Sequence, residues 1–342
     1  MKRVCFLTNN INQCGGIERV ISSLSMGFSN DDEISLTILS LNSKKNNSYF
    51  LFAEKTICIH ANCPFDKAPD DYLIHFFAEN AFDDLVTFHS DIALAVTRII
   101  NRIKPIRWIA TEHHDPEYYT WKRRLLNLYA YHRADCLVVL TDKAAEYYRR
   151  KLIKNILIIP NPVSFMSGEL KRSSKQILAV GRMEAVKRFD LLVEAFGSIE
   201  IRYPDWNLCI VGAGSEYEKL KQQSSKYKNI RLLGQRSDVK ELMLDSSFLV
   251  ISSQYEGFSV VAIEALECGL PIVSTELPSI RYISKGYECC TFSKQNNCNS
   301  LAAKIEQLIG NPALIQSMSL EAKKCAQQYH PDNIVSKWKE IL

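Results

Sequence analysis

Short apolar runs alternate with amphipathic stretches along the chain, and this rhythm constrains the fold more than any other feature. In the first half, strands are predicted at 3–9, 34–41, 84–89, 106–111, 135–141 and 155–161. Helices are predicted at 16–28, 91–103, 119–133 and 142–151. The strands are almost continuously apolar, so both faces of their sheet must be covered. The pattern predicts a doubly wound parallel α/β sheet.

The composition then shifts at 161–175, where Pro, Gly, Ser and charged residues replace the periodic pattern. After this stretch the rhythm restarts, with strands predicted at 176–182, 206–214, 229–234, 247–253 and 270–275. We therefore predict an N-terminal domain over 1–163, a linker over 164–175 and a C-terminal domain over 176–330. Ligands of such sheets bind beyond the carboxyl ends of the strands, and we expect a cleft between the two domains.

The composition excludes some classes of function. A net charge of +4 over 342 residues is too mild for a nucleic-acid-binding protein. The 11 cysteines lie scattered, without CxxC pairs or metal-like spacing, which favours a reducing compartment. The first apolar run is too short for a signal peptide, and no stretch approaches the length of a spanning helix. We expect a cytoplasmic protein that could still rest on a membrane surface.

Two stretches are compatible with phosphate binding. Gly15 and Gly16 open a helix after the first strand, where free backbone N–H groups suit an anion. A plain strand-to-helix turn explains these glycines equally well. Arg182 and Lys187 follow the first strand of the second half and could grip a diphosphate, although taken alone the pair is better explained as solvated surface charges. For the Gly-rich stretch 211–220 an ordinary tight turn is favoured.

The stretch "EGFSVVAIEALECGLPIV" places two carboxylates eight positions apart, at Glu256 and Glu264. Gly257 allows close backbone approach, and a helix is predicted from about Ser259, with N–H groups free for an anion. Helical rise puts Glu264 about 8–12 Å further along. Because its neighbours are apolar, a functional role for Glu264 is favoured over an ordinary helix glutamate.

Histidines follow two strands of the first half. His113 and His114 in "TEHHDPEYY" could transfer protons or bind a hydroxyl or phosphate, whereas His89 is expected to be a solvated loop residue. The stretch 118–135 is basic and aromatic. An amphipathic helix with a charged outer face is favoured for it, and contact with an anionic membrane surface is the alternative.

The order of these motifs resembles the retaining GT-B glycosyltransferases of family 4. The motifs are Gly15-Gly16, Arg182 with Lys187, and above all Glu256 with Glu264 in an E-x7-E segment. Ser259 stands where Gly is common in the family. "NIRLLGQRSDV" at 229–239 also resembles a family loop. The likeness spans nearly the whole chain and implies two Rossmann-like domains facing a central cleft. It also implies that 331–342 forms a helix that packs back on the first domain.

The resemblance implies roles for individual residues. Gly16, with Gly15, would present its N–H to the donor diphosphate, and Arg182 and Lys187 would stabilise the leaving group. Glu256 would contact the donor sugar beside Gly257, Phe258 and Ser259, and Glu264 would hold the ribose. His113 would lie near the acceptor and the 6-hydroxyl of the sugar. Backbone around Leu233 and Gly234 would contact the base. The family needs no metal and no cofactor besides the nucleotide sugar.

The resulting hypothesis is a retaining, metal-independent glycosyltransferase. Its expected donor is a UDP-sugar, and its expected acceptor is a glycan or polyprenyl-linked oligosaccharide of bacterial surface polysaccharide synthesis, such as lipopolysaccharide, O-antigen or capsule. Peripheral contact with the inner membrane leaflet would suit such an acceptor. Two alternatives are a GT-B-fold sugar-nucleotide epimerase and a catalytically silent nucleotide-sugar-binding subunit. The E-x7-E segment argues against the first, and the presence of Arg182, Lys187 and Glu256 against the second.

Overall fold

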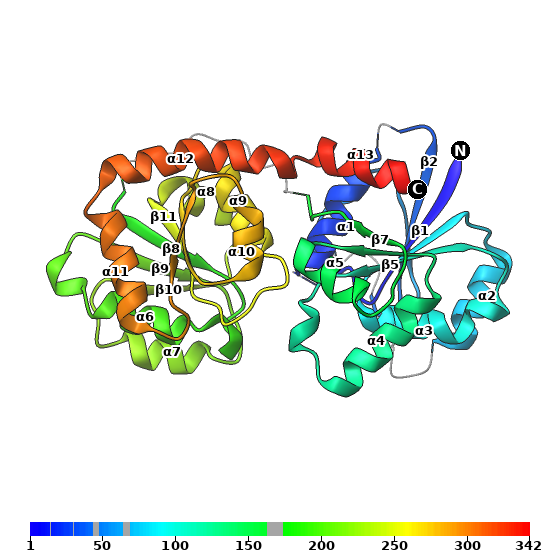
Figure 1. Cartoon of the computed structure of the whole chain (residues 1–342), viewed down its shortest axis with the longest axis horizontal. Coiled ribbons are helices and arrows are strands. Elements are labelled where there is room, and N and C mark those ends of the chain that lie inside the picture. The colour runs from blue at the N-terminus through cyan, green and yellow to red at the C-terminus, as the bar shows by residue number, and fades with distance from the viewer. Residues whose placement is uncertain (14, 30, 44–47, 64–68, 163–173) are drawn as a thin grey trace. The chain divides into compact units, whose positions relative to one another are not determined.

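The chain forms two compact units. The computed structural model describes residues 1–13, 15–29, 31–43, 48–63, 69–162 and 174–342. Unit 1 comprises Met1–Ser164 together with His330–Leu342, and unit 2 comprises Phe165–Tyr329 (Figure 1). Of the linker predicted at 164–175, all but the last two residues lie outside the described part of the chain.

Unit 1 is built on a seven-stranded sheet in which every pairing is parallel, in the order β3-β2-β1-β4-β5-β6-β7. Its strands are β1 (Lys2–Thr8), β2 (Ile34–Ser40), β3 (Ile57–His60), β4 (Asp84–Thr87), β5 (Arg107–Glu112), β6 (Cys136–Val139) and β7 (Ile156–Ile158). Its helices are α1 (Gly16–Gly27), α2 (Asp70–Glu79), α3 (Ser90–Ile99), α4 (Trp121–Arg133), α5 (Asp142–Arg149) and α13 (Pro331–Ile341). Single 3-10 turns occupy Ile100–Arg102 and Pro116–Tyr118.

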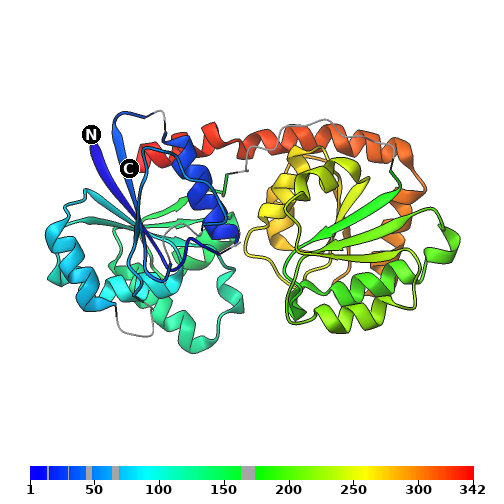
Figure 2. The same cartoon turned by 180° about the vertical axis from the view of Figure 1, so that it is seen from behind.

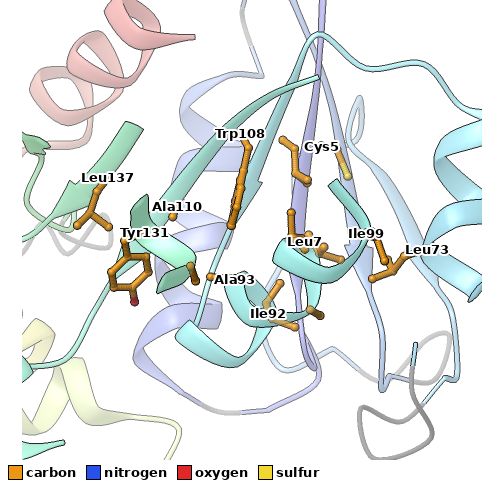
Figure 3. Packing of buried hydrophobic residues seen from close by; sticks show 14 of the residues in the cluster. Cys5, Leu7, Leu73, Ile92, Ala93, Ile99, Trp108, Ala110, Tyr131 and Leu137 are labelled. Carbon is orange, nitrogen blue, oxygen red and sulfur yellow. The ribbon is translucent and has the colours of Figure 1, made fainter. Parts of the chain in front are cut away.

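Both faces of this sheet are covered by apolar side chains, as its apolar strands require. On one face, residues from α2 to α5 pack against the strands, and Figure 3 shows Trp108 and Tyr131 among Leu7, Ile92 and Leu137 in this cluster. On the other face, α1 and α13 lie side by side, as both overall views show (Figure 2). The segment 331–342 is therefore helical and belongs to the core of unit 1.

Unit 2 repeats the architecture with a six-stranded parallel sheet in the order β10-β9-β8-β11-β12-β13. Its strands are β8 (Gln176–Val180), β9 (Asn207–Val211), β10 (Ile230–Gly234), β11 (Phe248–Ile251), β12 (Ile272–Thr275) and β13 (Cys290–Ser293). Its helices are α6 (Phe189–Gly197), α7 (Tyr217–Ser224), α8 (Val239–Asp245), α9 (Val260–Glu267), α10 (Pro278–Ile283), α11 (Cys298–Ile309) and α12 (Pro312–Ala326). Short 3-10 turns occupy Ala185–Lys187, Glu200–Arg202 and Gln327–Tyr329.

The expected fold class of two Rossmann-like parallel α/β domains is confirmed, while several elements had no sequence-based prediction. The strands β3 and β13 and the helix α2 belong to this group. Other elements are shorter than expected. The strand predicted at 84–89 ends at Thr87, and the one predicted at 155–161 spans only Ile156–Ile158.

Each sheet has a point where the strand order reverses. In unit 1 the chain runs outward from β1 to β3 and then restarts on the other side of β1 at β4. In unit 2 the same reversal falls between β8 and β11. Ligands of doubly wound sheets bind at the carboxyl edge of the strands beside such a reversal, because the flanking loops diverge there. The expected ligand sites are therefore the carboxyl ends of β1, β4 and β5 in unit 1 and of β8 and β11 in unit 2.

Candidate active site

At the reversal point of unit 2, a cation and a carboxylate form an ion pair. Lys187, in the turn after β8, places its Nζ 2.6 Å from Oε1 of Glu256, in the loop after β11. The Ser253 hydroxyl donates a 2.8 Å hydrogen bond to the same oxygen. Both charged side chains are largely shielded, with 21% of Lys187 and 13% of Glu256 exposed. Two residues predicted from separate motifs are thus brought together.

Backbone contacts hold the two loops of this pair together. The N–H of Gln254 donates to the carbonyl of Val186 at 2.8 Å, and the Ser252 hydroxyl donates to the carbonyl of Lys187 at 2.8 Å. From β12, the Thr275 hydroxyl donates to the carbonyl of Ser253 at 2.7 Å. The ion pair is therefore held on a rigid frame rather than on a freely moving loop.

Arg182 lies in the same loop as Lys187 but behaves differently. Its side chain is exposed, and its guanidinium has no hydrogen bond or ion pair with the described residues. A guanidinium offers a planar fork of N–H donors that matches phosphate geometry. Arg182 is therefore available to an anion at the edge where Lys187 lies.

Two glycines of the stretch 211–220 allow the loop after β9 to pack closely against the backbone of the loop after β8. Gly212 and Gly214 have φ of +145° and +159°, and a Cβ on them would lie 1.9 Å from the Gly181 oxygen and 2.4 Å from the Met183 oxygen. The N–H of Met183 also donates to the Ala213 carbonyl at 2.8 Å. This geometry agrees with the tight-turn interpretation, and it locks the loop after β9 against the loop that carries Arg182.

The helix α9 begins one residue after Ser259, as the sequence predicted for this stretch. The Ser259 Oγ accepts a hydrogen bond from the Ala262 N–H at 3.3 Å and so caps the helix. Phe258 packs edge to face on Tyr329, with ring centroids 6.1 Å apart. Gly257 lies in the loop between Glu256 and this cap. Glu264 is buried in α9, with 1% of its surface exposed, so the two glutamates of the E-x7-E segment lie in different environments.

Leu233 and Gly234 end the strand β10. The β10–β9 register shifts between Leu232 and Gly234, and Gly234 adopts a left-handed conformation with φ of +67°. Nothing lies within 4 Å of the position a Cβ would take on Gly234. The space beside this half-buried glycine is therefore open, and contact with the base stays a prediction.

In unit 1, Gly15 caps α1 and Gly16 is its first residue, but the helix start already has a carboxylate beside it. Glu18 is buried, and its Oε2 lies 2.2 Å from the position of a Cβ on Gly15. A carboxylate in the first turn is favoured by the same helix dipole that attracts phosphate. Gly15 therefore leaves room for the Glu18 side chain, a reason for this glycine that the sequence pattern did not reveal.

The reversal point of unit 1 gathers buried polar atoms without partners among the described residues. These atoms are Thr8 Oγ1, Asn9 Oδ1, His89 Nε2 and His113 Nδ1. They follow or end β1, β4 and β5, which are neighbours in the sheet. Buried polar atoms without partners are costly, so these four need hydrogen bonds from ordered water or from a ligand.

Burial lowers the pKa of both histidines. The pKa of His113 falls to about 3 and that of His89 to about 4, in each case through loss of water and then through the neighbouring histidines. Both rings are therefore neutral at pH 7. His113 Nε2 is hydrogen-bonded to the Thr111 hydroxyl at 2.9 Å, and its ring stacks on Phe88. The expectation of a solvated loop histidine is wrong for His89, whose Nε2 is buried and whose φ is +80°.

Behind His113 lies a buried carboxylate that sequence reasoning missed. Glu112 accepts hydrogen bonds from the hydroxyls of Tyr119, Tyr131 and Tyr148 at 2.9–3.0 Å and from the N–H of His114 at 2.9 Å. Burial raises the pKa of this carboxyl, but the His114 and Tyr131 donors outweigh burial and leave the pKa below its usual range. A glutamate that ends an otherwise apolar strand was the available sequence signal.

Within the described residues, no group of three His, Cys, Asp or Glu side chains is placed to hold a metal ion. None of the helices described is both long and apolar enough to cross a bilayer.

Comparisons with known proteins complete the description. A family model described as glycosyl transferases group 1 matches residues 164–325, and one described as glycosyltransferase family 4 matches residues 14–165. An uncharacterized glycosyltransferase of Haemophilus influenzae is 30% identical, and the amylovoran biosynthesis glycosyltransferase AmsD of Erwinia amylovora 27% identical, each over 100% of both chains. The solved structure of Anabaena Alr3699/HepE in complex with UDP-glucose superimposes with a TM-score of 0.83 at 14% identity, again covering 100% of both chains. The chain therefore belongs to glycosyltransferase family 4 and has the GT-B fold.

Proposed function

We propose that this glycosyltransferase moves a sugar from a UDP-sugar to a hydroxyl of a glycan or polyprenyl-linked acceptor, with retention and without a metal ion. The observation that carries the proposal is the shielded pair of Lys187 and Glu256 beside the exposed Arg182, at the reversal point of unit 2. Fixed cations suit a diphosphate, and an adjacent carboxylate suits sugar hydroxyls. A nucleotide sugar joins these two chemistries in one molecule.

The proposed chemistry follows from these charges. The difficult step is departure of the nucleoside diphosphate while the sugar becomes oxocarbenium-like, so cations aimed at the leaving group are the expected largest contribution. The Lys187 ammonium has three N–H donors. One donates to Glu256, and the others would donate to phosphate. Glu256, held by Ser253, would bind sugar hydroxyls near the reacting carbon. Retention would follow from same-face attack, with the leaving phosphate helping to deprotonate the acceptor.

The remaining donor contacts are proposed from the family resemblance. Glu264 would bind the ribose hydroxyls, and the open backbone at Leu233 and Gly234 would contact the base. Gly16 would offer its N–H to the diphosphate. Support for uridine comes from the solved structure of Alr3699/HepE, which contains UDP-glucose.

In unit 1 we assign the unpartnered atoms of Thr8, Asn9, His89 and His113 to hydroxyl groups of sugar or acceptor. Sugar hydroxyls both donate and accept hydrogen bonds, which suits such a mixed set of atoms. Because the pKa of His113 is about 3, its ring would bind a hydroxyl as a neutral imidazole and would not act as a cation toward phosphate.

We further place the reaction in the synthesis of a bacterial surface polysaccharide, in the cytoplasm at the inner face of the membrane. Support comes from AmsD, whose name assigns it to amylovoran biosynthesis. A polyprenyl-linked acceptor would be presented at the membrane, so peripheral contact with the inner leaflet is part of this proposal.

The donor site is tested by thermal unfolding and calorimetry with UDP, GDP, ADP and CDP in the presence of EDTA. We expect UDP alone to stabilise the protein, by about 2.7 kcal/mol at a hundredfold excess over Kd. Arg182→Ala and Lys187→Ala should abolish the effect, and Glu264→Ala should weaken it. Lys219→Ala is the matched control, because Lys219 is an exposed lysine of unit 2 that pairs with Glu216.

Failure of all four nucleotides to stabilise the protein, or an equal loss in Lys219→Ala, would refute the donor site. Dependence of binding or turnover on a divalent metal would refute the metal-free mechanism. Retention is tested separately by NMR of the product of a UDP-sugar, because the anomeric coupling constant distinguishes retention from inversion.

A further inference from the structure

The helix α4 of unit 1 exposes large apolar side chains on its outer face. Trp121, Leu125 and Tyr129 are 67%, 58% and 58% exposed, and Leu126 is 50% exposed. Residues four apart lie above one another on a helix, so Trp121, Leu125 and Tyr129 form one stripe, with Leu126 beside it. The favoured prediction of a charged outer face therefore holds only in part, because these apolar side chains share that face with Lys122 and Arg133.

The inner side of α4 includes a polar residue among apolar and aromatic ones such as Ala130 and Tyr131. Asn127 is buried, and neither its Oδ1 nor its Nδ2 has a hydrogen-bond partner in the described part of the chain. Tyr131 reaches into the core cluster of Figure 3 and donates its hydroxyl to Glu112. A surface helix normally turns apolar residues inward and polar residues outward. In α4 this order is partly reversed, so folding alone does not account for its outer face.

The charged side chains of α4 itself are all positive. The segment Trp121–Arg133 contains no acidic residue. Lys122 and Arg133 are exposed, and the Lys122 Nζ lies 5.6 Å from the centre of the Trp121 ring. His132 is hydrogen-bonded to the carbonyl of Lys151 at 3.1 Å, which brings the basic end of α5 next to the end of α4.

Two further cations of α4 are engaged with other residues of unit 1. Arg123 pairs with Asp91 and hydrogen-bonds Ser90, and Arg124 donates to the carbonyls of Tyr119 and Glu117. These contacts anchor the helix to unit 1. Lys122 and Arg133 are exposed at the two ends of the apolar stripe, although Arg133 also donates a 3.0 Å hydrogen bond to the side-chain oxygen of Asn101.

We propose that the outer face of α4 binds an anionic membrane surface, with Trp121, Leu125 and Tyr129 at the level of the lipid headgroups. Aromatic side chains prefer this depth, and cations beside them meet lipid phosphates. A second copy of the chain fits the face less well, because two such faces would bring like charges together. The inference deepens the peripheral contact included in the proposed function and concerns binding alone.

The test uses the full chain and vesicles of phosphatidylethanolamine and phosphatidylglycerol in equal parts, with phosphatidylcholine vesicles for comparison. Trp121 is the exposed one of the 4 tryptophans, since Trp108, Trp206 and Trp338 are at most 9% exposed. We expect a blue shift of tryptophan fluorescence and co-sedimentation with the anionic vesicles only. Both should weaken with added salt.

Variants locate the surface. Leu125→Ser with Leu126→Ser should reduce vesicle partitioning about tenfold or more, and Lys122→Gln and Arg133→Gln about fivefold each. The matched control is Ile201→Ser with Leu320→Ser, which removes two exposed apolar side chains from unit 2. Each variant is also checked for stabilisation by UDP, so that loss of membrane binding is distinguished from failure of the donor site.

Three results would overturn the proposal. One is absence of binding to anionic vesicles, and another is an equal loss of binding in the Ile201/Leu320 control. The third is a concentration-dependent dimer, detected by sedimentation, that disappears in Leu125→Ser with Leu126→Ser, because a second copy would then cover this face.

Discussion

One oxygen of Glu256 receives both the Lys187 ammonium and the Ser253 hydroxyl, so its position depends on two neighbours of different chemistry. Ser253 is buried and is itself held through its carbonyl by Thr275. Lys187 is proposed to serve phosphate as well as Glu256. No phosphate contact is proposed for Ser253. A substitution of Ser253 therefore tests the positioning of Glu256 more directly than a substitution of Lys187 does.

Ser253→Ala should lower kcat/KM for the UDP-sugar on the order of tenfold, because a hydrogen bond to a charged group contributes about 1.5–3 kcal/mol. The affinity for UDP should stay unchanged, since Ser253 touches neither cation of the phosphate site. Ser253→Thr, which keeps the hydroxyl, should restore activity. Ser274→Ala is the control, because its buried hydroxyl bonds only a backbone carbonyl. A parallel loss of UDP affinity in Ser253→Ala would point to a structural role instead.

The two buried histidines of unit 1 predict a pH dependence of stability. Because their folded pKa values, about 3 for His113 and about 4 for His89, lie below the unfolded value near 6.5, the unfolded chain binds more protons below pH 6.5. Stability should therefore fall as pH decreases from 6.5 to about 4.5, with each histidine contributing up to about 1.4 kcal/mol per pH unit.

Urea denaturation of unit 1 between pH 5 and 7 checks this dependence. His113→Gln should reduce the slope by up to one proton, and His75→Gln, at an exposed histidine of the same unit, should leave it unchanged. An unaltered slope in His113→Gln would mean that this ring is not held neutral in the folded protein.

Sequence reasoning named Lys187, Glu256 and Glu264 because their motif spacing is specific. It did not find the contacts made by their neighbours. Ser253 and Glu112 belong to no spacing pattern, since their importance comes from atoms that distant segments bring close to them. Of these two residues, Glu112 gave the stronger sequence signal, because it is a charged residue at the end of a buried strand.

At the scale of elements, the long apolar strands and the helices between them were predicted to within a few residues. Among the elements that were missed, β3 and β13 are short strands at the edges of their sheets, whereas α2 is a helix of 10 residues. An edge strand is paired on one side only, so its sequence needs less apolar character. The outer face of α4 was misjudged for another reason. A helical pattern gives the period of apolar residues, but it does not state which side faces the sheet.

At the scale of the whole molecule, unit 1 is closed by residues that follow all of unit 2 in the sequence. Trp338 in α13 is 4% exposed and packs 6.3 Å from the ring of Phe6 in β1. Ile334 and Val335 lie in the same cluster. The helix α13 therefore follows unit 2 in the sequence but belongs to unit 1 in the structure.

Trp338→Ala should destabilise unit 1 by about 3–5 kcal/mol, as expected for removing a buried aromatic side chain. Hydrogen exchange should accelerate in β1 and α1 while unit 2 keeps its protection. Lys337→Ala, a neighbouring exposed position, serves as the control. Loss of protection concentrated in α12 or β13 would contradict the assignment of α13 to the core of unit 1.

Because unit 1 is built from two separate segments, the two units are expected to complete their folding in a definite order during synthesis. Domains fold largely as units during synthesis, and the earlier one in the chain usually completes first. Here the later unit is contiguous, whereas the earlier one waits for residues 330–342. Until α13 has left the ribosome, Phe6 and the inner side of α1 lack their cover. Unit 2 is thus expected to finish before unit 1, and a nascent chain halted before residue 330 should be prone to recognition by chaperones.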